Sequence, residues 1–199
     1  MSKPDEIRKT RLIIGVSGAS GAIYAISLLH LLQQVPNIET HLVLSDAARV
    51  TISLETDYKV DYVLGLASRF YDFRDLAAPI SSGSFQSLGM VIIPCSMKTL
   101  SGIVNSYSDN LLLRAADVVL KERRRLVLVV RESPLHLGHL RLMVQATEMG
   151  AVIAPAMPAF YHHPKTIQGI LDYSIIRILD LLDINFEKEH FSRWGEQAS

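Results

Sequence analysis

The stretch Gly15-Val16-Ser17-Gly18-Ala19-Ser20-Gly21 lies between an apolar run, residues 12–14, and a helix-periodic segment, residues 22–32. A strand, a glycine-rich turn and a helix start typically open an α/β fold. Glycines let the backbone turn tightly and approach a ligand, and the free N–H groups of the first helical turn favour an anion. We therefore predict that a phosphate binds at this turn, while tight packing alone would also explain the glycines.

The spacing of these glycines favours one class of ligand. It reads Gly-x-x-Gly-x-x-Gly, which differs from the Gly-x-Gly-x-x-Gly fingerprint of dinucleotide sites. No acidic residue closes a second strand about 20 residues further on, where the ribose of NAD would need one. A mononucleotide therefore fits this turn better than NAD.

Apolar runs recur along the chain with helix-periodic segments between them. Continuous Val, Ile and Leu runs are typical of strands covered on both faces, so we predict a doubly wound parallel sheet between two helical layers. Asp109 is predicted to cap a helix over 110–123, a helix over 136–149 ends at Gly150, and a last helix covers 166–182. The predicted strands are 12–16, 41–44, 90–93, 126–130 and 151–154.

Length and composition indicate one domain over residues 1–199, with a charged extension at 1–10 and a polar tail at 185–199. Twenty basic and twenty acidic residues cancel, so neither nucleic acid nor an anionic membrane is an expected partner. The single cysteine, Cys95, and the lack of a signal-peptide pattern favour a cytoplasmic protein. No run is long enough for a membrane span, and the 49% hydrophobic content favours a homo-oligomer.

Ligands of doubly wound sheets bind beyond the carboxyl ends of the strands. The residues that follow the predicted strands are polar: Gly18-Ala19-Ser20, then Ser45, then residues 94–99, then Arg131-Glu132, then residues 155–161. Loops are generally polar, so this pattern supports a binding edge without proving it.

At these residues the chain resembles the flavin prenyltransferase family, the UbiX-type proteins that were long described as aromatic-acid decarboxylases or their partners. The resemblance runs from about residue 11 to residue 184 and returns at 193–195. It is carried by GVSGASGA (15–22), SLETD (53–57), ISSGSF (80–85), PCSMKTLSGI (94–103), RAADVVLKERR (114–124), VRESPLHLGHLRLM (130–143) and PAFYHHP (158–164).

The resemblance implies a flavodoxin-like (Rossmann-like) three-layer sandwich that forms a homo-oligomer, for which we expect a dodecamer. It also implies the reaction. A dimethylallyl group passes from dimethylallyl monophosphate to N5 and C6 of reduced FMN, and phosphate is released without a metal. The product, prenylated FMN, serves a separate UbiD-type decarboxylase, in a pathway that the sequence leaves open.

The resemblance also implies site residues. Glu55 is the expected general base for the proton that leaves flavin C6, and Ser20 is expected near the reacting N5. Lys121, Tyr161 and Arg177 match the positions that bind the leaving phosphate, with Glu132 nearby in a role that stays open. FMN is expected to contact Gly18, Ala19, Ser20, Ser45, Ser96, Met97, Lys98, Thr99 and Arg131.

Two other functions compete with prenyl transfer. An FMN-dependent decarboxylase shares this fold, but its Pro-x-Met-Asn-x-x-Met-Trp loop is not matched by residues 155–161. A non-enzymatic FMN-binding accessory protein would leave Glu55 and Lys121 without a purpose. His136 and His139 invite a metal hypothesis, but they lack a third ligand, so we expect helix capping or surface packing there and a packing role for Cys95.

Overall fold

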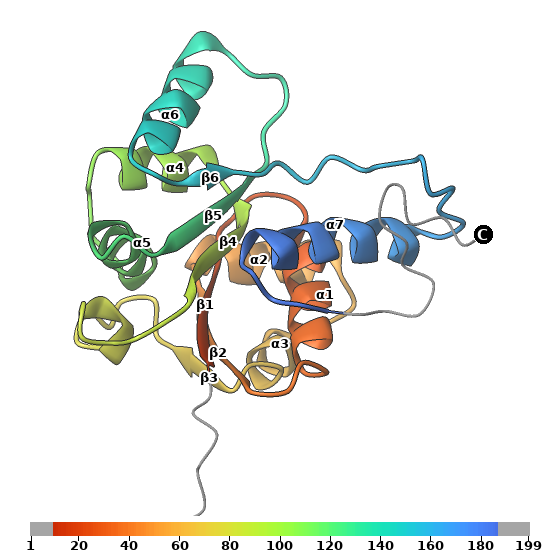
Figure 1. The fold of residues 1–199 in the computed structure, drawn as a ribbon, viewed down its shortest axis with the longest axis horizontal. Helices are drawn as coiled ribbons and strands as arrows, with labels where there is room; N and C mark the ends of the chain where they lie inside the picture. Colours follow the sequence, from red (N-terminus) through yellow and green to blue (C-terminus); the bar gives the residue numbers. More distant parts are fainter. Residues whose placement is uncertain (1–9, 187–199) are drawn as a thin grey trace, which may run out of the picture.

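A computed structural model describes residues 10–186 of the chain (Figure 1). The predicted N-terminal extension therefore lies outside the described residues except for Thr10, which already begins the first strand. Most of the predicted polar tail lies outside them too. Of its first two residues, Asn185 is exposed and Phe186 packs against the hydrophobic core.

Six parallel strands form one sheet in the order β3-β2-β1-β4-β5-β6. This is the strand order of Rossmann-type doubly wound sheets, and it confirms the predicted α/β sandwich. All five predicted strands are present, mostly with extended bounds, and the short edge strand β3 is an additional one. The strands are β1 (Thr10–Val16), β2 (Ile38–Leu44), β3 (Arg69–Tyr71), β4 (Gly89–Cys95), β5 (Arg125–Val130) and β6 (Val152–Ile153).

Alternate residues of the strands enter two separate cores, one on each face of the sheet. Leu12 and Ile14 of β1 pack in a core with helices α1, α2, α3 and α7, whereas Ile13 packs in a core with α4, α5 and α6. Both faces of β1 are therefore apolar, which explains why its sequence is a continuous run and not an alternating one. Figure 1 shows the two helical layers on either side of the strands.

Helix starts are marked by capping side chains. Ser45, Ser96 and Thr166 each accept a hydrogen bond from a backbone N–H in the first turn of the helix that follows. The predicted cap Asp109 is wrong by one residue, because the Asn110 side chain accepts from Leu113 N. The helices are α1 (Ala22–Leu32), α2 (Asp46–Glu55), α3 (Val60–Gly65), α4 (Met97–Val104), α5 (Leu111–Lys121), α6 (Leu137–Glu148) and α7 (Ile167–Leu181), with a 3-10 turn at Pro79–Ser81.

Helix α6 is attached to the body by little of its surface. Ala146 is its fully buried residue, while Leu137, Leu140 and Val144 are exposed on one side at helical spacing. In Figure 1 this helix projects from the rest of the molecule. An exposed apolar stripe of this kind is typical of a surface that another chain covers. Over residues 10–186, no helix is long and apolar enough to cross a membrane.

Candidate active site

A cleft of about 390 Å³ opens at the carboxyl edge of the sheet, where β1 and β4 lie side by side. In the strand order 3-2-1-4-5-6 the chain leaves these two strands in opposite directions, so their loops diverge and leave a crevice. The cleft is therefore at the topological switch point of the fold. Its walls are Gly18, Ser45, Asp46, Ala47, Phe73, Ser96, Lys98, Thr99, Asn110, Leu112 and Leu113.

Two helices begin at this cleft. Ser45 caps α2 by accepting from Ala48 N at 3.0 Å, and Ser96 caps α4 by accepting from Thr99 N at 3.3 Å. The Ser96 hydroxyl also donates to Thr99 Oγ1 at 3.1 Å. Helix N-termini carry unpaired N–H groups and a partial positive charge, and Lys98 adds a full charge in the cleft wall. The cleft therefore suits a phosphate.

Gly18 is required by the way the first turn packs on α2. A Cβ atom built on Gly18 would lie 2.2 Å from the Cβ of Ala47, which is too close for two non-bonded carbon atoms. The glycine thus lets the β1 turn and α2 approach each other in the cleft wall. This packing explains the middle glycine of the stretch without any ligand.

Ser17 joins the two turns that flank the cleft. Its buried hydroxyl donates to the carbonyl of Pro94 at 2.8 Å and accepts from the backbone N–H of Ser96 at 2.8 Å. A second bond joins the Ser17 backbone N–H to the same Pro94 carbonyl at 3.2 Å. The Ser17 side chain therefore fixes the distance between the carboxyl ends of β1 and β4. Residue-type reasoning missed this role, because the serine forms no helix cap.

The anion at the start of α1 is a side chain of the protein itself. Glu55, the last residue of α2, accepts from Gly21 N at 2.7 Å and Ala22 N at 3.3 Å through Oε2. Desolvation alone would raise the pKa of Glu55, but the Ser20 hydroxyl, these two N–H groups and the charge of Arg131 together lower it below 4.5. The phosphate predicted at this helix start therefore fits better at the neighbouring cleft, beside α2 and α4.

The predicted FMN residues lie together at this edge of the sheet. Gly18, Ser45, Ser96, Lys98 and Thr99 line the cleft. The others lie on the adjoining turns. Ser20 bonds Glu55, and the charge of Arg131 acts on the same carboxylate. Ala19 is buried, and the Met97 side chain packs into the core on the α5 side.

The cleft also contains Asp46, Phe73 and Asn110, which residue-type reasoning missed. Of these, Asn110 carried a recognisable signal as a cap residue before an apolar run.

Lys121 lies at the other edge of the sheet. It ends α5, its Nζ bonds Glu122 Oε1 at 2.5 Å, and it lies against Gly83. The strand that follows begins at Arg125, which pairs with the first residue of β4, Gly89. The length of a seven-residue strand, roughly 20 Å, therefore separates Lys121 from the cleft of its own chain.

Tyr161 and Arg177 both lie at helix α7. The Tyr161 ring meets Tyr173 of that helix edge-on at 5.5 Å, and Arg177 follows Tyr173 by one helical turn. The Arg177 side chain is about half exposed, 55%, and bonds Asp180 at 2.8 Å. Glu132 follows β5 at the carboxyl edge and is exposed, with one oxygen accepting from Ser133 N.

The cysteine and the histidine pair have structural surroundings. Cys95 is fully buried, and burial raises the pKa of its thiol to about 12, which keeps it protonated. His136 caps α6 by accepting from Gly138 N at 3.0 Å, as expected. Within residues 10–186, no three His, Cys, Asp or Glu side chains gather into a group that could hold a metal ion.

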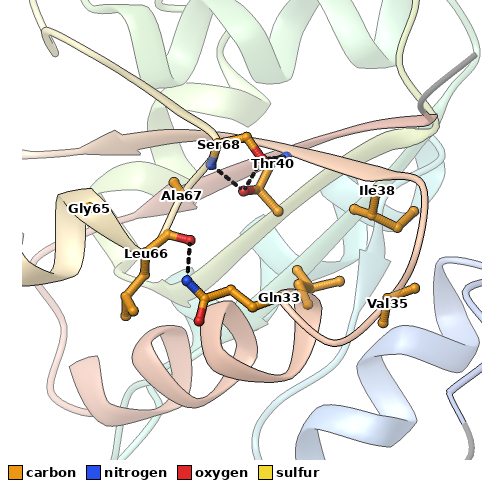
Figure 2. Close-up of a pocket in the computed structure, with 9 residues that line it drawn as sticks. Gln33, Val35, Ile38, Thr40, Gly65, Leu66, Ala67 and Ser68 are labelled. Carbon is orange, nitrogen blue, oxygen red and sulfur yellow. Dashed lines mark hydrogen bonds between the residues drawn. The ribbon is translucent and has the colours of Figure 1, made fainter.

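A second cleft lies at the amino edge of the sheet, where α1 and α3 end and β2 begins. Figure 2 shows apolar side chains such as Val35 and Ile38 in its lining. The polar groups there are bonded to one another, with Gln33 Nε2 donating to Leu66 O and Ser68 N donating to Thr40 Oγ1. Its lining contains no charged side chain. The cleft at the switch point, which carries Lys98 and two helix N-termini, is therefore the candidate active site.

A Rossmann-order sheet with a phosphate-type cleft at its switch point defines a nucleotide-binding α/β protein. The family model described as "Flavoprotein" matches residues 1–174 of the chain. A curated relative, flavin prenyltransferase UbiX of Escherichia coli (strain K12), is 62% identical over 184 residues, which are 92% of this chain and 97% of the relative. The chain therefore belongs to the flavin prenyltransferase family.

Solved structures agree with this assignment. AnUbiX in complex with FMN and dimethylallyl pyrophosphate is 48% identical, with a TM-score of 0.90 over 94% of this chain and 98% of that one. A dodecameric FMN-dependent UbiX-like decarboxylase from Escherichia coli O157:H7 is 49% identical, with a TM-score of 0.89 over 93% of this chain and 99% of that one.

Proposed function

We propose that this chain joins the dimethylallyl group of dimethylallyl monophosphate to N5 and C6 of reduced FMN and releases phosphate. The observation that carries the proposal is the 62% identity to a flavin prenyltransferase over 97% of that protein. The cleft supports it, because five of the predicted FMN residues line one phosphate-type site. A solved relative holds FMN together with dimethylallyl pyrophosphate.

FMN fits the cleft by the chemistry of the side chains present. Ser45, Ser96 and Thr99 offer hydroxyls, and Lys98 offers a charge to the terminal phosphate at the start of α4. Arg131, Ser20 and Glu55, which lie together on the adjoining turns, would hold the flavin ring. Bound in this way, reduced FMN supplies the nucleophilic ring atoms, and the protein supplies orientation and exclusion of water.

Glu55 is suited to receive a proton because its carboxylate is charged at neutral pH and its position is fixed. Two backbone N–H groups and the Ser20 hydroxyl hold it. Forming the bond at flavin C6 requires the ring to lose a proton, which a carboxylate beside the ring accepts. The same hydrogen bonds lower the pKa of Glu55 and make it a weaker base, and we assign the step to Glu55 together with Ser20, whose hydroxyl bonds the carboxylate and would pass the proton on.

The leaving phosphate develops negative charge, which fixed cations stabilise. We assign this role to Lys121, Tyr161 and Arg177, with Glu132 beside them. Lys121 lies at the far edge of its own chain, so in this proposal it reaches the cleft of a second copy. The exposed stripe on α6, a helix that begins five residues after Glu132, is a suitable surface for that second copy.

The assembly and the recipient of the product complete the proposal. A related UbiX-like protein is dodecameric, and we propose the same subunit number here. Prenylated FMN has to leave the cleft, and we propose a UbiD-type decarboxylase as the protein that takes it up. The cytoplasmic location stays a prediction from the sequence.

The reaction is tested by incubating the purified protein with reduced FMN and dimethylallyl monophosphate without oxygen. Mass spectrometry is expected to show FMN heavier by one prenyl unit, together with one equivalent of inorganic phosphate. Added chelator is expected to leave the rate unchanged. Unmodified FMN throughout, with the protein folded and FMN bound, would rule out the proposal.

A further inference from the structure

The candidate cleft contains one group that does not suit a phosphate. Asp46 is the first residue of α2, lines the cleft, and has a side chain that is 58% exposed. An acidic residue in a first helical turn stabilises the helix dipole, but its charge repels an anion that binds nearby. Among the residues that line the cleft, Asp46 and Lys98 are the charged ones, and their charges cancel.

Arg74 changes this balance from outside the cleft. Its guanidinium bonds the Asp46 carboxylate, with Nη2 and Oδ2 separated by 2.5 Å. With Arg74 counted, the group of three charges is net positive. The pair joins the loop after β3 to the start of α2, two segments that are 28 residues apart in the sequence.

The loop that carries Arg74 is held by several hydrogen bonds. Asp72 Oδ1 accepts from Arg74 N at 2.8 Å, and Asp75 Oδ1 accepts from Ala77 N at 3.0 Å. The carbonyl of Phe73, a residue of the cleft wall, accepts from Leu111 N at 2.9 Å. The backbone therefore presents Arg74 at the cleft mouth, although its side chain is 72% exposed.

We propose that Arg74 determines the preference of this cleft for a flavin with a terminal phosphate over a flavin without one. By neutralising Asp46 it removes the repulsion that a phosphate would meet at the start of α2, and it leaves Lys98 as the uncompensated charge. This inference rests on the proposed position of the FMN phosphate in the cleft. It concerns binding, and the chemistry of prenyl transfer does not depend on it.

The test compares two ligands that differ only by the phosphate. Flavin fluorescence titrations with FMN and with riboflavin are made at low ionic strength, where charge interactions are least screened. Arg74→Gln is expected to weaken FMN binding about fivefold and to leave riboflavin binding unchanged, since an exposed ion pair contributes modestly. Arg69→Gln, which removes an exposed, ion-paired arginine at the start of β3 and away from the cleft, is the matched control and is expected to affect neither ligand.

A second substitution makes the test specific to the pair. In Arg74→Gln protein, adding Asp46→Asn is expected to restore the affinity for FMN, because the repelling charge is gone. The inference is overturned if Arg74→Gln binds FMN as tightly as the parent protein, if riboflavin loses as much affinity as FMN, or if Asp46→Asn restores nothing. These outcomes are distinct from failure of the proposed function, because the parent protein is assayed separately for prenyl transfer.

Discussion

The carboxylate of Glu55 accepts a hydrogen bond of 2.7 Å from the backbone N–H of Gly21, a residue 34 positions earlier in the chain. This bond ties the end of α2 to the start of α1, and it places a negative charge beside Ser20 and within the field of Arg131. A carboxylate held by backbone N–H groups keeps one orientation, which is the property that a positioned proton acceptor needs.

Replacing Glu55 by Gln is expected to separate binding from chemistry. The amide oxygen can still accept from Gly21, so FMN binding should be within about twofold of the parent protein, while prenyl transfer should fall about a hundredfold for want of a base. Single-turnover formation of prenylated FMN, followed by mass spectrometry, measures the loss. A variant that turns over at the parental rate would show that Glu55 is not the base.

The same residue makes a pH-dependent contribution to stability. Although desolvation opposes it, the hydrogen bonds of the charged form lower the pKa of Glu55 in the folded protein below 4.5. A lowered carboxyl pKa contributes stability that is fully present above 4.5 and is lost as the pH falls through the folded value. Urea unfolding from pH 7 downward should therefore show the advantage of the parent protein over Glu55→Gln shrinking below that pH. A constant difference would contradict this.

Ser17→Ala tests the join between the two turns of the cleft. The substitution leaves the Ser96 N–H without its acceptor and removes one of the two hydrogen bonds that the Pro94 carbonyl accepts. The free energy of unfolding should therefore fall by about 1–3 kcal/mol. FMN affinity should fall as well, because the cleft walls are no longer held at a set distance. Ser27→Ala, a buried serine of α1 outside this cleft, is the control and should leave FMN affinity unchanged. Equal affinities for both variants would refute the role of Ser17.

Gly18→Ala is expected to destabilise the fold by about 1–3 kcal/mol through overpacking, because its new Cβ meets Ala47. The clash also displaces the cleft wall, so FMN binding should weaken. Adding Ala47→Gly removes the opposing methyl group and should recover most of both properties, with the backbone of residue 47 still 3.2 Å and 3.3 Å from the new Cβ. Thermal unfolding and FMN titration of the single and double variants measure this, and a double variant no better than the single one would contradict the packing explanation.

A site shared between two copies predicts complementation. Glu55→Gln inactivates the cleft, and Lys121→Met removes the cation that we assign to a neighbour. Each variant alone should be nearly inactive. Co-refolding equal amounts should restore about a quarter of the sites, because random mixing pairs an intact cleft with an intact Lys121 that often. No recovery in mixed oligomers of confirmed composition would show that Lys121 does not serve the cleft of a second copy, and an active Lys121→Met variant would place Lys121 outside the site.

Sequence by itself determined five of the strands, four of the helices and the edge of the sheet at which the candidate site lies, while it did not locate α2, α3 and α4. Gly18 and its neighbours predicted the first turn, continuous apolar runs predicted buried parallel strands, and Ser45 and Ser96 stood where those strands end. These signals are local, because strand burial, turns and helix caps depend on residues within a few positions of one another. The predicted cap of α5 was wrong by one position, since Asn110 and not Asp109 caps the helix. The strand β3 was missed because three residues are too few to show a hydrophobic pattern.

Only the tertiary structure decided which of these residues meet. Glu55 reaches the start of α1, Ser17 bonds Ser96 across 79 positions, and Arg74 meets Asp46, whereas Lys121 lies at the far edge of the sheet. Such contacts depend on how strands are ordered and how loops return, which no local pattern of residues encodes. The family resemblance could propose Lys121 as a phosphate ligand, but only the three-dimensional fold showed that it lies far from the cleft of its own chain, so that the proposed role depends on a second copy.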